Sequence, residues 1–245
     1  MIEVKDGKNY RVISSNVTEF SDSVGYCEHK IPFFMEGLKA PPSQAVIRGS
    51  AMHEAAEAKE KEQFVFEPIT AAELADMTRN VEFAREDIST RLMFPIKTQD
   101  KPIMVILFGR ADKIYRMDET LVVEEDKFPA SLDRYEGRFE PFAGQKLQAL
   151  AYLNSRFADG QEQGPDKWFD INHSKKEWVI RIMDREKNEP FRIYKGVQNE
   201  EAEQFLYSSI ERFAYLVLGI VPREHHNTMS KCRPCGYKDK CEFRL

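Results

Sequence analysis

The chain has 245 residues, of which 42% are hydrophobic and 31% charged, and its formal net charge is −5. This length fits one domain with a sizeable core, and the acidic balance argues against a protein that coats nucleic acid through its overall charge. The longest apolar run, residues 214–221, is far shorter than the roughly 20 residues of a membrane-spanning helix. The first residues lack the basic and apolar regions of a secretory signal, so we expect a cytoplasmic protein.

Caps, periodicity and turn residues predict the elements in chain order. Helices are expected over residues 14–38, 50–62, 71–92, 142–157 and 199–218, with a break at 41–42. Strands are expected on both sides of a turn at 118–119, and again at 178–183 and 191–194, with a loop at 160–164 between the two groups. Helices that flank a central group of strands predict an α/β layer architecture.

The two strands around the turn carry acids where a core would be apolar. If the turn lies between Asp118 and Glu119, the residue numbers of each pair of opposed residues on the two strands sum to 237. Asp112 then lies opposite Glu125. Opposed Cβ atoms are roughly 4.5–5.5 Å apart, a distance at which like charges destabilise a sheet. Lys127 projects from the same face as Glu125. Two carboxylates and one ammonium beside apolar strands indicate a Mg2+ or Mn2+ site for phosphoryl chemistry, and the alternative is an exposed, charged hairpin.

Basic residues follow the same stretch of sequence. They are Arg110, Lys113, Arg116, Lys127, Arg134, Arg138 and Lys146. They form either a channel for phosphate groups or a solvated basic face.

The cysteines have the spacing of metal ligands. Cys232, Cys235 and Cys241 follow a Cys-x2-Cys-x5-Cys pattern, and Cys27 lies near the other end of the chain. Two disulfides are not expected in an intracellular protein. A zinc ion and an iron-sulfur cluster both accept four thiolates, and a zinc site has further possible ligands in His29, His225 and His226.

Four short motifs occur in a fixed order: Gly49-Ser-Ala-Met-His53, Gly109-Arg-Ala-Asp112, Glu125-x-Lys127 and Gln148-x3-Tyr152. Together they resemble the RecB-like branch of the PD-(D/E)XK nuclease superfamily over most of the chain, although the proline of the superfamily motif is missing. One early and three late cysteines are most similar to its iron-sulfur members, among them the CRISPR-associated nuclease Cas four. The resemblance implies an α/β fold with a restriction-endonuclease-like core, a central mixed β-sheet flanked by helices. It also implies one domain over residues 1–245, in which residues 14–38 and 222–245 form a joint iron-sulfur-stapled lobe.

The resemblance also assigns roles to single residues. The metal ligands for Mn2+ or Mg2+ would be His53, Asp112, Glu125 and the backbone carbonyl of Asp126. Lys127 would orient the attacking water, and Gln148 and Tyr152, on one helical face, would support the site and the DNA. Cys27, Cys232, Cys235 and Cys241 would hold one 4Fe-4S cluster, which the resemblance favours over structural Zn2+.

The activity implied is that of a metal-dependent deoxyribonuclease, an exonuclease on single-stranded ends or overhangs that works with a CRISPR integrase complex in spacer acquisition. The alternatives are a nuclease of general recombination, repair or viral DNA metabolism, and a non-catalytic DNA-binding iron-sulfur scaffold. A zinc hydrolase built on His53 is disfavoured, because the second histidine of His-Glu-x-x-His is missing. Phe33, Phe34 and Trp168 are expected in the core rather than stacked on bases.

Overall fold

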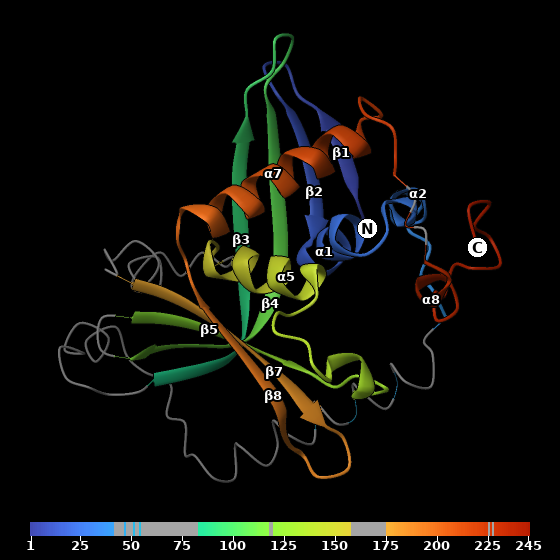
Figure 1. The fold of residues 1–245 in the computed structure, drawn as a ribbon. Helices are drawn as coiled ribbons and strands as arrows, with labels where there is room; N and C mark the ends of the chain where they lie inside the picture. The colour runs from blue at the N-terminus through green and yellow to red at the C-terminus, as the bar shows by residue number, and fades with distance from the viewer. Residues whose placement is uncertain are drawn as a thin grey trace.

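The computed structural model describes residues 1–41, 47, 51, 54, 83–117, 120–157, 175–224, 226 and 228–245. The first half of the chain holds β1 (Glu3–Asp6), β2 (Arg11–Asn16), α1 (Val17–Gly25), η1 (Glu28–Lys30), α2 (Ile31–Met35), β3 (Phe83–Ile96), β4 (Ile103–Met117) and β5 (Thr120–Lys127). The second half holds η2 (Asp133–Tyr135), α5 (Ala143–Leu153), β6 (Arg156–Phe157), β7 (Lys175–Asp184), β8 (Glu189–Val197), α7 (Glu200–Val217) and α8 (Met229–Cys232). Figure 1 shows their arrangement.

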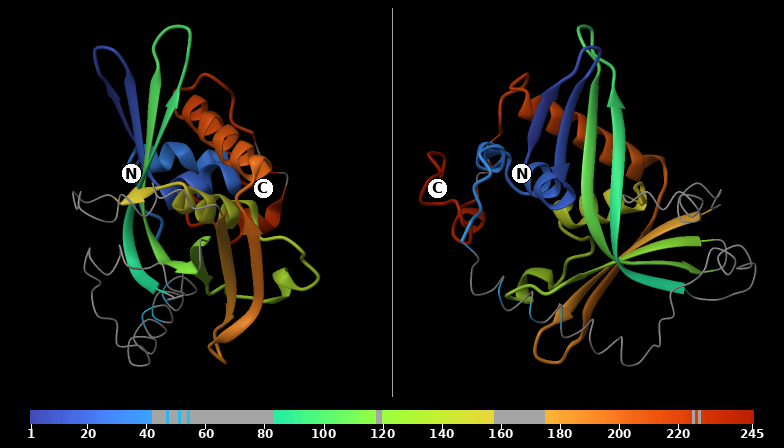
Figure 2. Two further views of the ribbon diagram at one scale, coloured as in Figure 1. Left: turned by 90° about the vertical axis from the view of Figure 1, so that its left-hand side faces the viewer. Right: turned by 180° about the vertical axis from the view of Figure 1, so that it is seen from behind.

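The strands form one mixed sheet in the order β1-β2-β4-β5-β7-β8, with β3 beside β4 and β6 beside β3. The β2–β4 and β5–β7 pairs are parallel, and the other pairs are antiparallel. Helices α1, α5 and α7 pack on one another, α1 and α7 contact β4, and α5 lies against β5 and β7. Figure 2 shows these helices together on one side of the strands. The mixed, helix-flanked sheet predicted from the sequence is therefore confirmed.

Strand β4 changes its neighbour part-way along one edge. Its residues 103–108 pair with β2, and residues 113–117 pair with β5. The four residues between, 109–112, pair with neither of these two described strands, although β3 continues along the other edge. The gap exists because the chain of β2 turns into α1 at Val17, while β5 continues along β7. We call residues 109–112 the fork. Places where strand order changes are common positions for binding sites in open α/β sheets.

Side-chain caps and aromatic contacts place the helices over the sheet. Asn16 begins α1, since its side chain accepts a hydrogen bond from the Glu19 backbone at 2.7 Å. Asn199 begins α7 through a bond from the backbone of Ala202 at 2.8 Å. The centre of the buried Phe20 ring in α1 lies 5.4 Å from that of Phe213 in α7, in an edge-to-face arrangement. Asn16 is one of the three residues, with Ser14 and Ser15, that the sequence offers as the cap of its helix, and Asn199 begins the helix predicted over 199–218.

The helices predicted over 71–92 and 142–157 are wrong over part of their length. The helix predicted over 71–92 is strand β3 from Phe83 onward, and 71–82 lie outside the described residues. Buried Leu92 and Ile96 alternate with exposed residues, and β3 pairs with β4 along its length, so tertiary pairing decides the conformation. The helix predicted over 142–157 ends at Leu153, because residues 156–157 pair with β3 as β6.

The predicted helix over 14–38 is interrupted. Residues 14–16 belong to β2, and the chain between α1 and α2 is extended at Cys27, with φ −158° and ψ 114°. The hairpin of β1 and β2 was not predicted. The helix expected over 50–62 lies outside the described residues except for Ala51 and Glu54, which are helical. Within the described part of the chain, no helix has the length and apolar character needed to cross a membrane.

Candidate active site and cysteine pocket

The two predicted acids lie at the fork, where backbone pairing between β4 and β5 ends. The pairs run from Met117↔Thr120 to Lys113↔Glu124, each summing to 237 as predicted. At the next pair, Asp112 and Glu125, hydrogen bonds from backbone to side chain take the place of hydrogen bonds between the two backbones. Glu125 Oε1 accepts a hydrogen bond from the Asp112 backbone at 3.2 Å, and Asp112 Oδ2 accepts one from the Asp126 backbone at 2.8 Å. Each carboxylate is thus fixed by the backbone of the opposite strand.

Lys127 forms an ion pair with Glu125. Its ammonium donates to Glu125 Oε2 at 2.7 Å, and the Glu125 side chain is fully buried. Burial raises the pKa of Glu125 to about 7; the Lys127 ammonium opposes this effect and the Asp112 charge adds to it. Burial disfavours the charged form of Lys127, but Glu125 and Asp112 together raise the pKa of that ammonium. The carboxylate oxygens of Asp112 and Glu125 are ligands of the kind that a divalent ion prefers.

Helix α5 brings Gln148 and Tyr152 to the same place. Tyr152 is 2% exposed, and its hydroxyl accepts a hydrogen bond from the Gln148 amide at 3.4 Å. Burial raises the pKa of Tyr152, and the nearby Glu125 charge raises it further, so the phenol stays protonated. A Cβ atom on Gly109 would lie 2.5 Å from Cε1 of Tyr152, so the ring packs directly on the fork and the first motif position must be glycine.

The Asp126 carboxylate has a different partner from the acids at the fork. Arg181 donates to both of its oxygens at 2.6 Å and also lies 3.1 Å from Glu124. Lys113 is 3.7 Å from the same Glu124 carboxylate. Glu124 and Asp126 alternate with Glu125 and therefore project from the other face of β5. The Asp126 carboxylate therefore lies away from the fork with Arg181, and the predicted metal ligand is its backbone carbonyl.

Among the described side chains, the expected basic residues do not all lie on one face of the sheet. Lys113 lies with Glu124 on the face of β5 opposite to Lys127. Arg134 and Arg138 lie over the Phe142 ring, 5.1 and 4.0 Å from its centre. Lys113 and Lys127 therefore do not line the same channel for phosphate groups.

Several predicted site residues lie outside the described part of the chain. They are His53, Trp168 and His225. Among the described residues, no three His, Cys, Asp or Glu side chains are placed so that together they could hold one metal ion. The carboxylate oxygens of Asp112 and Glu125 are of the type that Mg2+ and Mn2+ prefer, so these residues fit such an ion.

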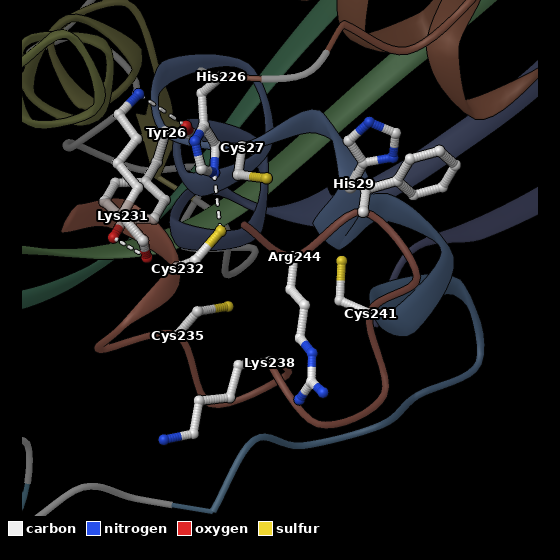
Figure 3. A pocket seen from close by; sticks show the side chains of 11 residues that line it. Tyr26, Cys27, His29, His226, Lys231, Cys232, Cys235, Lys238, Cys241 and Arg244 are labelled. Carbon is white, nitrogen blue, oxygen red and sulfur yellow. Dashed lines mark hydrogen bonds between the residues drawn. The ribbon is translucent and has the colours of Figure 1, made fainter. Parts of the chain in front are cut away.

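The four cysteines line one pocket between the N-terminal segment and the tail. Cys27 follows α1, Cys232 ends α8, and Cys235 and Cys241 come from the turns after it. All four are free thiols, and Figure 3 shows their sulfur atoms turned toward a common space. His226 Nε2 lies 3.9 Å from the Cys232 sulfur. Burial raises the pKa of the Cys27 thiol.

Four thiols around one pocket suit either one zinc ion or an iron-sulfur cluster, because both accept four cysteine ligands.

Direct contacts join the segment that carries Cys27 to the last part of the chain. Glu28 receives two hydrogen bonds from Arg212 of α7, at 2.5 and 2.9 Å, and one from the Glu224 backbone at 2.6 Å. The Phe33 ring stacks on Tyr237 with centres 4.7 Å apart, and Phe34 is 8% exposed. The core role predicted for both phenylalanines is confirmed.

Comparisons with known proteins give a limited result. No protein-family model and no curated protein matches the chain. Among solved structures, SSO0001 is 17% identical, with 99% of this chain and 90% of that one covered, at a TM-score of 0.46. The alkaline exonuclease LHK-Exo of Laribacter hongkongensis is 12% identical, with 84% and 89% covered, at 0.42. Its complex with dAMP gives 12% identity, 83% and 89% coverage, and 0.39. Similarity at this level does not establish a shared function, so the proposals below rest on the residues of this chain.

Proposed function

We propose that this protein is a metal-dependent nuclease that hydrolyses phosphodiester bonds of DNA. The observation that carries the proposal is the group of buried Glu125 with half-buried Asp112 and Lys127 at the fork, where Tyr152 packs on Gly109. Buried acids this close to each other are rarely needed for stability. Perturbed acids beside a charged partner are typical of catalytic sites.

Each residue has a proposed role. Asp112, Glu125 and the carbonyl of Asp126, with His53 assigned from its motif alone, would hold Mg2+ or Mn2+, which lowers the pKa of a bound water and stabilises charge on phosphate oxygens. Lys127, fixed at 2.7 Å from Glu125, orients the attacking water and balances charge on the phosphate. Tyr152 keeps its proton and can donate it in a hydrogen bond to a phosphate oxygen, and Gln148 positions its hydroxyl.

The proposals for the substrate, the cluster and the partners rest on the sequence motifs. We propose an exonuclease that acts on single-stranded ends or overhangs, with one structural 4Fe-4S cluster held by Cys27, Cys232, Cys235 and Cys241. The partners proposed are DNA and a CRISPR integrase complex during spacer acquisition. The converging cysteines support the cluster.

A cleavage assay tests the proposed activity. End-labelled single-stranded DNA should be degraded with Mn2+ and remain intact in EDTA, and purified Asp112→Asn should not degrade it. Cleavage that continues in EDTA, or in Asp112→Asn, would contradict the mechanism. A wild-type protein that binds DNA without cleaving it under any divalent ion would favour the non-catalytic scaffold.

Metal analysis tests the cluster. Protein purified without oxygen should be brown and contain about four irons per chain. A colourless protein with one bound zinc would overturn this part of the proposal and leave the proposal for the fork unchanged.

A further inference from the structure

Two hydrogen bonds join the residues that precede two of the pocket cysteines. Tyr26 comes directly before Cys27, and Lys231 directly before Cys232. The Tyr26 hydroxyl donates to the backbone carbonyl of Lys231 at 2.8 Å, and the Lys231 ammonium donates to the backbone carbonyl of Tyr26 at 2.9 Å. The ammonium also lies 5.2 Å from the centre of the Tyr26 ring, within cation–π range. Each side chain thus fixes the backbone beside the other's cysteine.

Local hydrogen bonds hold each of these two cysteines within its own segment. The Cys27 backbone donates to the Asp22 carbonyl at 2.9 Å, and the Cys27 carbonyl accepts from Lys30 at 3.1 Å. In the tail, the Cys235 backbone donates to the Cys232 carbonyl at 3.0 Å. Neither set of bonds determines how far apart the two segments lie. The Tyr26–Lys231 bonds cross between the two segments, as does the Phe33–Tyr237 stack, but among the bonds of the described residues they alone join the residues directly before the two cysteines. Figure 3 shows the two side chains together beside the pocket.

We propose that the Tyr26–Lys231 pair positions Cys27 and Cys232 for their metal group before that group binds. The proposal deepens the cysteine site described above and rests on it for the identity of the ligand. Its central statement, however, concerns the metal-free protein, because both bonds are made by protein atoms alone. A preformed site loses less conformational freedom when the ligand binds. The tail should therefore stay in place without metal, and a weakened pair should release the metal group faster.

Amide hydrogen exchange of the metal-free protein tests the preformed pocket. Peptides over residues 229–241 should be protected in the wild type. They should exchange about tenfold faster in Lys231→Met, which loses a charge-assisted bond, and several-fold faster in Tyr26→Phe, which loses one neutral bond and keeps the ring. Lys238→Met is the matched control, since Lys238 lines the same pocket but is not part of the pair, and it should exchange at the wild-type rate. A wild-type tail that exchanges like an unfolded segment, or equal rates in Lys231→Met and Lys238→Met, would overturn the proposal.

Metal release provides a second readout that does not need nuclease activity. Iron should pass from loaded Lys231→Met to a ferrous chelator about tenfold faster than from the wild type or Lys238→Met, in line with the loss of one charge-assisted bond. Equal release rates in all three proteins would overturn the positioning role. A protein without nuclease activity would contradict the proposed function, while hydrogen exchange and metal release would still decide the role of this pair.

Discussion

Gly109→Ala tests the contact on which the arrangement at the fork depends. The new Cβ would lie 2.5 Å from Cε1, 2.9 Å from the hydroxyl oxygen and 3.1 Å from Cζ of Tyr152. Contacts below 3.0 Å force one side to move, and Tyr152 has little room because it is 2% exposed. Overpacking of this kind costs about 1–3 kcal/mol. Displacing the ring also moves its hydroxyl, so cleavage should fall along with stability.

A second substitution separates this contact from a general intolerance of the strand to alanine. Tyr152→Leu removes all three atoms that the new Cβ would meet. In that background Gly109→Ala should be neutral, or stabilise by up to about 1 kcal/mol, because alanine restricts the unfolded chain more than glycine does. Urea unfolding of the four proteins measures the difference between the two backgrounds. The same cost for Gly109→Ala in both backgrounds would refute the packing of Tyr152 on Gly109.

Three further predictions concern the site metal, Lys127 and the ion pair of Glu28. Mn2+ should support cleavage at least as well as Mg2+, because imidazole binds the softer ion better. Ca2+ should permit DNA binding with little cleavage. Higher cleavage rates in Mg2+ than in Mn2+ across a metal titration would contradict a histidine ligand. Lys127→Met should lower the single-turnover cleavage rate at least about 100-fold with DNA binding retained, and an unchanged rate would exclude Lys127 from the reaction. Arg212→Ala should lower the free energy of unfolding by about 1–2 kcal/mol, the range for bonds to a charged group that is partly exposed. The control Arg244→Ala, whose ion pair is exposed, should change it by less than about 0.5 kcal/mol, and equal effects of the two substitutions would contradict a structural role for Glu28.

The hairpin at the fork was predictable because its signal is local. The position of the turn and the alternation of side chains fix every pair from Met117↔Thr120 to Lys113↔Glu124. Asn16 and Asn199 are equally local signals, since each caps the helix that follows directly. The sequence also placed Asp112 next to Glu125.

Other features depend on contacts between distant segments and could not be predicted in this way. The apolar spacing in residues 83–92 suits either a helix or a strand, and the pairing of β3 with β4 decides between them. The change of neighbour along β4 follows from where β2 turns into α1. Tyr152 and Gly109 each belong to a recognisable motif, but their contact requires α5 to lie over the fork. The bonds between Tyr26 and Lys231 have no sequence signal beyond the adjacent cysteines.

The most direct test of the central claim compares two neighbouring acids of β5. Glu125 is buried at the fork with Lys127, whereas Glu124 lies on the other face with Arg181. We predict that Glu125→Gln abolishes DNA cleavage and weakens Mn2+ binding at least about tenfold, while Glu124→Gln, the matched control, retains both. Cleavage and Mn2+ titration of the two purified variants, each confirmed to be folded, provide the measurement. A Glu125→Gln protein that cleaves DNA as fast as Glu124→Gln would contradict the assignment of the active site.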